Sequence, residues 1–260
     1  MHPFVNIAIK AARRAGKIIL QASQRLDRLK ISEKSSAQDL VTNIDQAAED
    51  DIIETIHRAY PQHCILAEEM GEITKNDTDI VWIIDPIDGT NNFIRGFPHY
   101  CISIAIQRKG IVEHGVIYDP CRDELFTASK GDGAQLNGQR IRVSNCVNLE
   151  KSVIGTGFAY KRAGIPTEKY LQKFSIFLQE CSIRRAGAAA LDLAYIASGR
   201  LDGFWEMGLK PWDIAAGSIL IREAGGFISD DKGEDHYLSS GKVIAGNVKI
   251  YPKLLKILSL

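Results

Sequence analysis

Long apolar runs are missing from this sequence of 260 residues. None approaches the ~20 consecutive apolar residues that a membrane-spanning helix needs. The N-terminus, Met1-His2-Pro3-Phe4, also lacks the charged region, apolar stretch and small-residue cleavage site of a secretory signal. We therefore expect a cytoplasmic protein that makes no contact with a membrane.

An excess of charge of one sign is missing as well. The chain carries 32 basic and 32 acidic residues, so it lacks the basic surplus of a dedicated nucleic-acid binder. Its 5 cysteines are scattered and form no Cys-x-x-Cys pair, which argues against a disulfide framework or a zinc knuckle. Its 6 histidines show no metal-ligand spacing. The sequence therefore gives no sign of a metal site built on cysteine or histidine.

Hydrophobic periodicity predicts helices at the two ends of the chain and strands in its middle. Phe4, Ile7, Ala8 and Ala11 begin an apolar stripe that predicts a helix over the first thirty residues. A second helix is expected from about Asn43 to Tyr60. Further strands are predicted at residues 63–67, 80–85, 100–108, 110–118, 124–128, 133–136, 140–143, 152–156, 201–206 and 243–245, and further helices at 167–180, 188–198, 212–224 and 248–258. This order predicts one domain over residues 1–260, with two α/β halves that meet near residue 150.

Residues 81–93, VWIIDPIDGTNNF, form the most informative segment. An apolar strand ends in Asp85, and Pro86 biases that residue toward an extended conformation. Asp88 follows within a tight turn, and Gly89 permits a close approach of the backbone to a ligand or a neighbouring segment. Carboxylates on such a strand-to-helix loop are hard oxygen ligands of the kind that magnesium prefers. A plain Asx turn is the alternative, but it does not easily explain two acids, a glycine and a hydroxyl directly after an apolar strand.

Acidic residues elsewhere in the chain are further candidates. Glu68 and Glu69 end another apolar run, although adjacent glutamates are more often solvated surface. Asp45 and Asp213 each lie near a predicted helix N-terminus, where an acid that complements the helix dipole is the ordinary explanation. Spacing alone does not bring these regions together.

Two segments resemble the signature motifs of the inositol monophosphatase family: Asp85-Pro86-Ile87-Asp88-Gly89-Thr90 and Trp212-Asp213-Ile214-Ala215-Ala216-Gly217. The resemblance extends over nearly the whole chain and includes Lys34-Ser35-Ser36. The opening Met-His-Pro and residues 190–203 resemble the bacterial branch of the family. The resemblance implies a layered α/β fold, the αβαβα sandwich of the inositol monophosphatase and fructose-1,6-bisphosphatase superfamily.

The resemblance also implies a role for particular residues. The implied ligands of Mg²⁺ are Glu68, Asp85, the Ile87 carbonyl, Asp88 and Asp213. The implied catalytic residues are Thr90 and Asp45, which act on the attacking water, together with Glu68. The implied substrate contacts are Gly89, Thr90, Ala189, Glu206 and Asp213. This sequence departs from the family pattern at two positions: Met70 replaces the usual Ser or Thr, and Asn91 replaces the usual Thr. Every acid of the pattern is kept.

These residues predict Mg²⁺-dependent hydrolysis of a small phosphate monoester, with inositol monophosphate as the leading substrate. The resemblance adds inhibition by lithium and a homodimer. The nearest alternative is a related phosphatase acting on fructose bisphosphate, histidinol phosphate or a nucleotide 3′-phosphate. A second is a non-enzymatic protein that binds transcription complexes, with Arg184 and Arg185 as a possible contact, and a third is an inactive scaffold.

Overall fold

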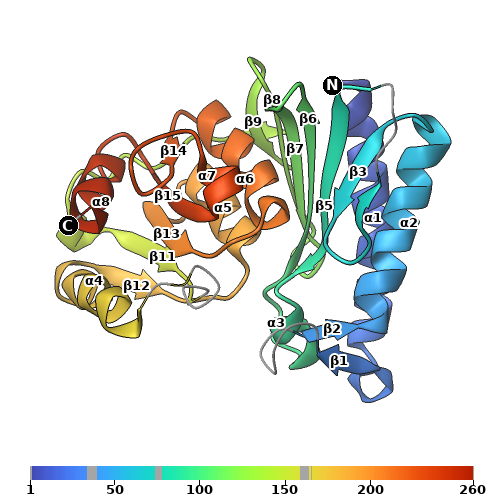
Figure 1. The fold of residues 1–260 in the computed structure, drawn as a ribbon, viewed down its shortest axis with the longest axis horizontal. Coiled ribbons are helices and arrows are strands. Elements are labelled where there is room, and N and C mark those ends of the chain that lie inside the picture. The colour runs from blue at the N-terminus through green and yellow to red at the C-terminus, as the bar shows by residue number, and fades with distance from the viewer. Residues whose placement is uncertain (1, 34–39, 74–77, 159–163, 165, 260) are drawn as a thin grey trace.

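The structure is a computed structural model that describes residues 2–33, 40–73, 78–158, 164 and 166–259. Its elements form five layers in the order helices, sheet, helices, sheet, helices (Figure 1). The predicted αβαβα sandwich is therefore confirmed. The segment Lys34-Ser35-Ser36, on which part of the family resemblance rests, lies outside the described residues.

The first layer consists of α1 (Pro3–Ser23) and α2 (Asn43–Ala59), which pack together on one face of the larger sheet (Figure 1). The buried face of α1 is made mostly of small residues, so this helix can lie close to the strands. A Cβ atom on Gly16 would lie only 2.6 Å from the Tyr118 ring. The helix ends at Ser23, earlier than the thirty residues predicted, and a 3₁₀ turn follows at Leu26–Arg28.

The larger sheet has 8 strands in the order β10-β9-β8-β7-β6-β5-β3-β4. Its strands are β3 (Cys64–Ala67), β4 (Gly71–Ile73), β5 (Ile80–Asp88), β6 (Cys101–Arg108), β7 (Ile111–Asp119), β8 (Glu124–Ser129), β9 (Gly133–Leu136) and β10 (Gln139–Arg140). The predicted meander and hairpin are confirmed, although β10 is shorter than the predicted strand at 140–143. All neighbours are antiparallel except β3 and β5, which run parallel and therefore end at the same edge. A separate ribbon pairs β1 (Ile31–Glu33) with β2 (Leu40–Thr42).

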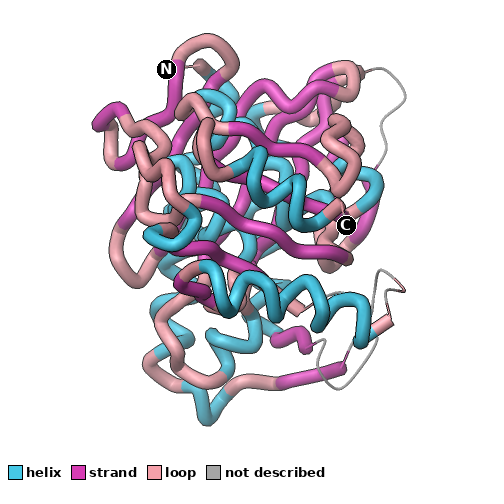
Figure 2. The backbone as a smooth tube through the Cα atoms, turned by 90° about the vertical axis from the view of Figure 1, so that its left-hand side faces the viewer, coloured by secondary structure: helices cyan, strands magenta, loops and turns pink. Residues whose placement is uncertain are grey.

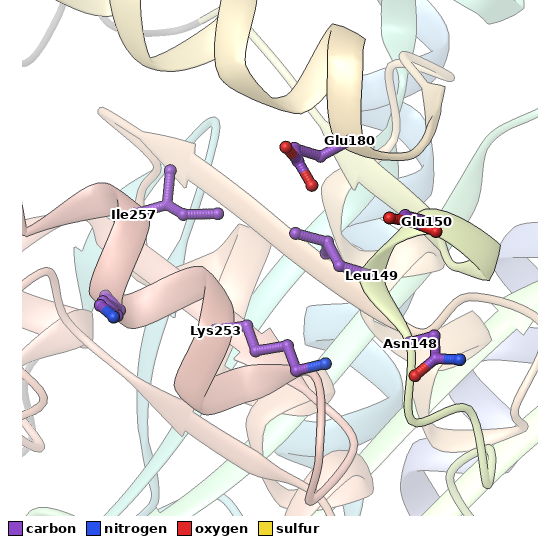
Figure 3. A pocket seen from close by; sticks show the side chains of 7 residues that line it. Asn148, Leu149, Glu150, Glu180, Lys253 and Ile257 are labelled. Carbon is purple, nitrogen blue, oxygen red and sulfur yellow. The ribbon is translucent and has the colours of Figure 1, made fainter.

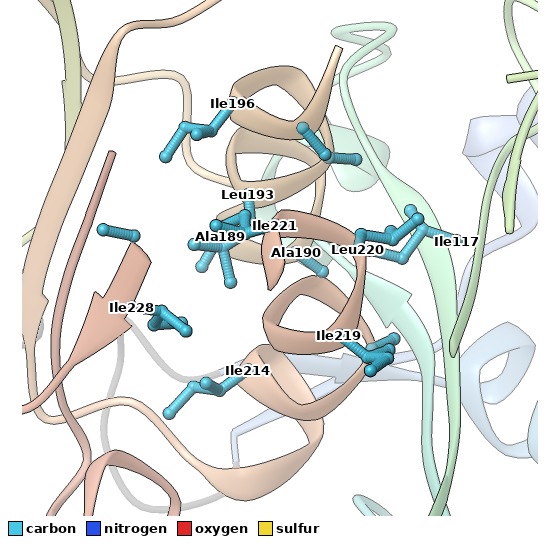
Figure 4. Packing of buried hydrophobic residues seen from close by; sticks show 14 of the residues in the cluster. Ile117, Ala189, Ala190, Leu193, Ile196, Ile214, Ile219, Leu220, Ile221 and Ile228 are labelled. Atoms are coloured by element: carbon cyan, nitrogen blue, oxygen red, sulfur yellow. The ribbon is translucent and has the colours of Figure 1, made fainter. Parts of the chain in front are cut away.

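The middle layer consists of α5 (Ala189–Ala197) and α6 (Pro211–Glu223), which lie between the two sheets (Figure 1). Figure 4 shows Leu220 of α6 directed toward Ile117 of the larger sheet, with Ile228 of the smaller sheet on the other side. A helix with neighbours on both sides is expected to be apolar around most of its circumference, and α6 is buried from Ile214 to Ile221. None of the helices in the described residues is both long and apolar enough to cross a membrane.

The smaller sheet has 5 strands in the order β12-β11-β13-β15-β14. These strands are β11 (Val153–Thr156), β12 (Ser182–Arg184), β13 (Gly203–Met207), β14 (Phe227–Ser229) and β15 (Lys242–Gly246). Helices α4 (Thr167–Glu180) and α8 (Tyr251–Leu258) form the outer layer, and the sheet and both helices face the viewer in Figure 2. The short α7 (Tyr237–Ser240) precedes β15.

Candidate functional site

A β-bulge at the end of β5 places two carboxylates side by side. Asp85 pairs with Ser103 and Asp88 with Cys101, so three steps along β5 match two along β6. In a regular strand, residues three apart point to opposite faces. The extra residue in the bulge removes this alternation, and carboxylate oxygens of Asp85 and Asp88 lie within 4.8 Å of each other.

Gly89 directly follows the bulge and is required there for two reasons. Its φ of +98° lies in the left-handed region. A Cβ atom at this position would also lie 3.0 Å from the His99 carbonyl oxygen and 3.3 Å from the Ala188 Cβ. The tight turn lets the short helix α3 (Thr90–Ile94) begin immediately after Asp88.

Thr90, the first residue of α3, contacts a carboxylate from a distant part of the chain. Its Oγ1 lies 2.9 Å from Asp45 Oδ1 and 3.0 Å from the Ile87 carbonyl oxygen, so its single hydrogen can be donated to either. Asp45 is fully buried in the first turn of α2. Its Oδ2 accepts hydrogen bonds from the backbone N–H of Thr42 at 2.8 Å and from the Thr42 hydroxyl at 2.5 Å. Asp45 is therefore both a capping residue and the partner of Thr90.

A third carboxylate reaches the bulge from the second half of the chain. One ligand oxygen each from Asp85, Asp88 and Asp213 lies within 4.8 Å of the others. Asp213 occupies the first turn of α6, where its Oδ2 accepts the Lys210 N–H at 2.7 Å. Glu68 is not a member of this group, but its charge acts on Asp85 and on Asp88. The structure therefore brings together the regions that sequence spacing could not connect.

The electrostatics of this acidic site fit a bound divalent cation. Burial raises the pKa of Asp85 well above its ordinary value, and the negative charges of Glu68 and Asp88 raise it further. Burial is also the main cause that raises the pKa of Asp88 to about 7, opposing the hydrogen bond from the Ala190 N–H. Carboxylates held this close repel one another, and a cation with hard oxygen ligands would relieve that repulsion.

The second half of the chain also supplies Ala189 and Glu206, two of the residues predicted to contact a substrate. The Ala190 N–H, in the first turn of α5, donates a hydrogen bond of 2.6 Å to Asp88 Oδ2, which places the neighbouring Ala189 at the site. Glu206 is buried in β13, and its charge contributes to the raised pKa of Asp88. A Cβ atom on Gly157 would lie 2.1 Å from the Glu206 carboxylate, so the absence of a side chain at Gly157 makes room for that carboxylate.

Asn92 connects the two halves beside the site. Its side-chain amide nitrogen lies 2.8 Å from the His99 carbonyl oxygen and 2.9 Å from the Ala186 carbonyl oxygen. An amide nitrogen carries two hydrogens, so it can donate to both. This side chain therefore ties α3, which begins two residues after Asp88, to the segment that leads into α5.

Sequence analysis missed the role of Glu49. This residue is fully buried in α2, and its carboxylate accepts hydrogen bonds from the backbone of Glu69 and Met70. A signal was present: positions 45, 49, 52 and 56 follow helical spacing, so the two acids continue the stripe of Ile52 and Ile56.

Two other features of the described chain lie apart from this acidic site. A second group with the spacing of metal ligands consists of Asp230, Glu234 and His236. Asp230 Oδ1 accepts hydrogen bonds from the backbone N–H groups of Lys232 and Glu234, so the position of Asp230 is explained by its role in a turn. A pocket of about 540 Å³ lies between α8 and the segments near residues 148–150 and 180 (Figure 3). Glu150, Glu180 and Lys253 line it, so its charges are mixed.

Comparison with known proteins identifies the family. The model of the inositol monophosphatase family matches residues 1–259. Nus factor SuhB of Escherichia coli strain K12 is 49% identical over 256 residues, which cover 98% of this chain and 95% of that protein. The chain belongs to the inositol monophosphatase family, and the predicted resemblance to its bacterial branch is confirmed.

Solved structures of two relatives have the same fold. Extragenic suppressor protein SuhB of Bartonella henselae aligns with a TM-score of 0.93 and 41% identity, covering 99% of this chain and 98% of that one. SaIMPase-II, an inositol monophosphatase of Staphylococcus aureus solved with inositol monophosphate bound, aligns with a TM-score of 0.81 and 30% identity, covering 98% of this chain and 93% of that one.

Proposed function

We propose that this protein is a Mg²⁺-dependent phosphatase that hydrolyses small phosphate monoesters, with inositol monophosphate as its leading substrate. The observation that carries the proposal is the contact of 2.9 Å between Thr90 Oγ1 and Asp45 Oδ1, directly beside the carboxylates of Asp85 and Asp88. A hydroxyl held by a buried carboxylate next to a cluster of hard ligands is suited to positioning water for attack on phosphorus.

The proposed metal ligands come from three segments of the chain. They are Glu68, Asp85, the Ile87 carbonyl, Asp88 and Asp213. When bound at these oxygens, Mg²⁺ would lower the pKa of water and offset the negative charge of the phosphate. Family membership supports the use of a divalent metal, and the donor set, made only of oxygen atoms, favours magnesium over zinc or copper.

Residues of the chain itself would position the attacking water and bind the phosphate. Asp45 accepts from the Thr90 hydroxyl and so holds the Thr90 oxygen toward the attacking water. A neutral hydroxyl does not remove a proton at pH 7, so the contribution of Thr90 is orientation. The backbone N–H groups of Gly89 and Thr90 would bind the phosphate oxygens, because the left-handed turn at Gly89 lets the main chain approach the ligand closely.

Substrate choice would depend on the second half of the chain. Glu206, Ala189 and Asp213 would contact the sugar hydroxyls, with Glu206 as an acceptor of their hydrogens. The Staphylococcus aureus relative with bound inositol monophosphate supports a polyol phosphate as the substrate. A site built to accept hydroxyl hydrogens discriminates strongly against esters that lack them.

The decisive experiment is an assay of the purified protein against a panel of phosphate monoesters. The panel contains inositol 1-phosphate, fructose 1,6-bisphosphate, histidinol phosphate, a nucleotide 3′-phosphate and an aryl phosphate. We expect inositol 1-phosphate to be hydrolysed fastest, activity to vanish in chelator and return with Mg²⁺, and lithium to inhibit. Full turnover in excess chelator would contradict the proposal.

A second candidate function comes from the name of the Escherichia coli relative, a Nus factor. That name favours binding to a transcription complex, either beside the phosphatase activity or instead of it. Purified protein that binds an elongation complex while hydrolysing nothing in the panel would establish the second function alone. Family membership also favours a homodimer, which sedimentation of the purified protein would test.

A further inference from the structure

Glu49 is a buried acid whose carboxylate holds the backbone of another segment. It lies on α2 with none of its surface exposed. Its Oε2 accepts the Glu69 N–H at 2.9 Å, and its Oε1 accepts the Met70 N–H at 2.7 Å. Burying an ionised carboxylate is unfavourable unless hydrogen bonds replace its water, and two N–H donors on separate oxygens supply such bonds.

The two N–H groups belong to the turn that carries Glu68. This turn connects β3 to β4, and Glu68 is its first residue. The Glu68 N–H donates to the Ile84 carbonyl oxygen of β5 at 3.2 Å, which fixes the turn on one side. Glu49 fixes the following two peptide groups on the other side. The backbone around Glu68 is therefore held from β5 and from α2 at once.

This anchoring aims Glu68 at the acidic site. The parallel pairing of β3 with β5 sets Ala67 opposite Ile84, so the next residues, Glu68 and Asp85, lie at the same level along the two strands. The charge of Glu68 is accordingly the largest contribution after burial to the raised pKa of Asp85. A turn released from Glu49 could carry the Glu68 carboxylate away from Asp85 without breaking the β3–β5 pairing.

The same helix also holds the other catalytic element. Asp45 and Glu49 are one helical turn apart, a rise of about 6 Å along the axis of α2. Asp45 contacts the Thr90 hydroxyl, whereas Glu49 holds the turn of Glu68. One face of α2 therefore sets the position of Thr90 and that of Glu68 relative to each other.

We propose that Glu49 is a positioning residue that orients Glu68 for metal binding, an inference that rests on the metal site of the proposed function. Glu49 would act only through Glu68. Its loss should therefore weaken the affinity for Mg²⁺, and it should do nothing further once the Glu68 carboxylate has been removed. A buried acid with a purely structural role would change the stability of the fold and leave the metal affinity of the folded protein unchanged.

The test measures Mg²⁺ affinity by isothermal titration calorimetry, without substrate, on variants shown to be folded by circular dichroism. Glu49→Gln keeps the shape, but its amide NH₂ group faces one of the two N–H donors, so one hydrogen bond is lost. Glu49→Asp keeps the charge and withdraws it by one methylene, and it serves as the second variant. Glu54→Gln is the matched control, because Glu54 lies on the exposed side of the same helix and pairs with Arg58.

We expect Glu49→Gln to weaken Mg²⁺ binding by roughly 10-fold to 100-fold, the usual effect of removing a group that orients a metal ligand. Glu54→Gln should bind like the unchanged protein, and Glu49→Gln combined with Glu68→Gln should bind no worse than Glu68→Gln alone. Unchanged affinity in both Glu49 variants, or losses that multiply in the double variant, would overturn the inference. Mg²⁺ binding without phosphatase activity in the unchanged protein would instead refute the proposed function and leave the inference intact.

Discussion

The hydroxyl oxygen of Thr90 lies 2.9 Å from Asp45 Oδ1, although 45 residues separate them in the sequence. The contact joins the first turn of α2 to the first turn of α3. Asp45 keeps its other carboxylate oxygen for Thr42, so its orientation does not depend on Thr90. Thr90 is thus held by a carboxylate that is already fixed.

This pair should behave as one unit in catalysis. Thr90→Val keeps the branched shape and deletes the hydroxyl, and Asp45→Asn keeps the shape and deletes the charge. We expect each change to lower kcat by roughly 10²–10⁴-fold, the range typical of a general-base contribution. The double variant should be little worse than either single one.

Steady-state kinetics on inositol 1-phosphate checks this prediction. Thr90→Ser, which keeps the hydroxyl, is the control and should retain most of the activity. Losses that multiply in the double variant would mean that Thr90 and Asp45 act separately.

Asp88→Asn should abolish turnover and leave the fold intact. The change removes the charge of one proposed ligand, while the asparagine oxygen can still accept the Ala190 N–H. We expect kcat to fall by roughly 10³-fold or more, since metal catalysis depends on a complete set of ligands. Circular dichroism should show an unchanged fold, and near-normal turnover would mean that Asp88 only shapes the turn.

Glu206→Gln should change the preference between substrates more than the rate of the chemical step. If Glu206 accepts hydrogens from sugar hydroxyls, kcat/KM should fall by roughly 10-fold or more for inositol 1-phosphate and far less for an aryl phosphate. Gly157→Ala should have a similar effect, because the new methyl group would displace the Glu206 carboxylate. Equal losses on both substrates would assign Glu206 a structural role.

The metal-free protein should lose stability as the pH rises. Burial is the main cause that raises the pKa of Asp88 from its ordinary value of 3.8 to about 7 in the folded chain. Between pH 4 and pH 7 the folded state therefore binds more protons than the unfolded state, so the free energy of unfolding falls with increasing pH. The raised pKa of Asp85 acts in the same direction.

Thermal melts at a series of pH values, with and without Mg²⁺, measure this effect. The increase in Tm produced by Mg²⁺ should grow from pH 5 to pH 7, because the metal favours the ionised carboxylates. Asp88→Asn should flatten the metal-free profile. A metal-free Tm that rises over this range would contradict the prediction.

Long periodic elements of the fold could be predicted from the sequence, whereas several of the shortest ones could not. Helix α4 spans the predicted Thr167–Glu180, because an apolar stripe covers its whole length. Strands β1, β4 and β14 were missed, because each has only 3 residues and exists through its hydrogen-bonded neighbour. The end of α1 was placed too late, because Leu26 and Leu29 continue the apolar pattern past the point where the helix stops.

Some residues of the candidate site could likewise be predicted from the sequence, and others could not. The acids of residues 85–88 could be identified from the sequence, since they follow an apolar strand directly. Glu49 was missed because an acid in an amphipathic helix is usually solvated, and only the packing of a turn 20 residues away gives it a partner. The juxtaposition of Asp213 with Asp85 likewise depends on how α6 packs between the sheets.

The bulge between Asp85 and Asp88 limits how the length of this chain can vary over evolution. An alternation of faces has only two states, so inserting one residue between them while the bulge is kept would direct one of the two aspartates to the far face of the sheet. No later substitution at either position could restore the pair. One-residue insertions should therefore be absent from this segment in active homologues, even where its side chains differ.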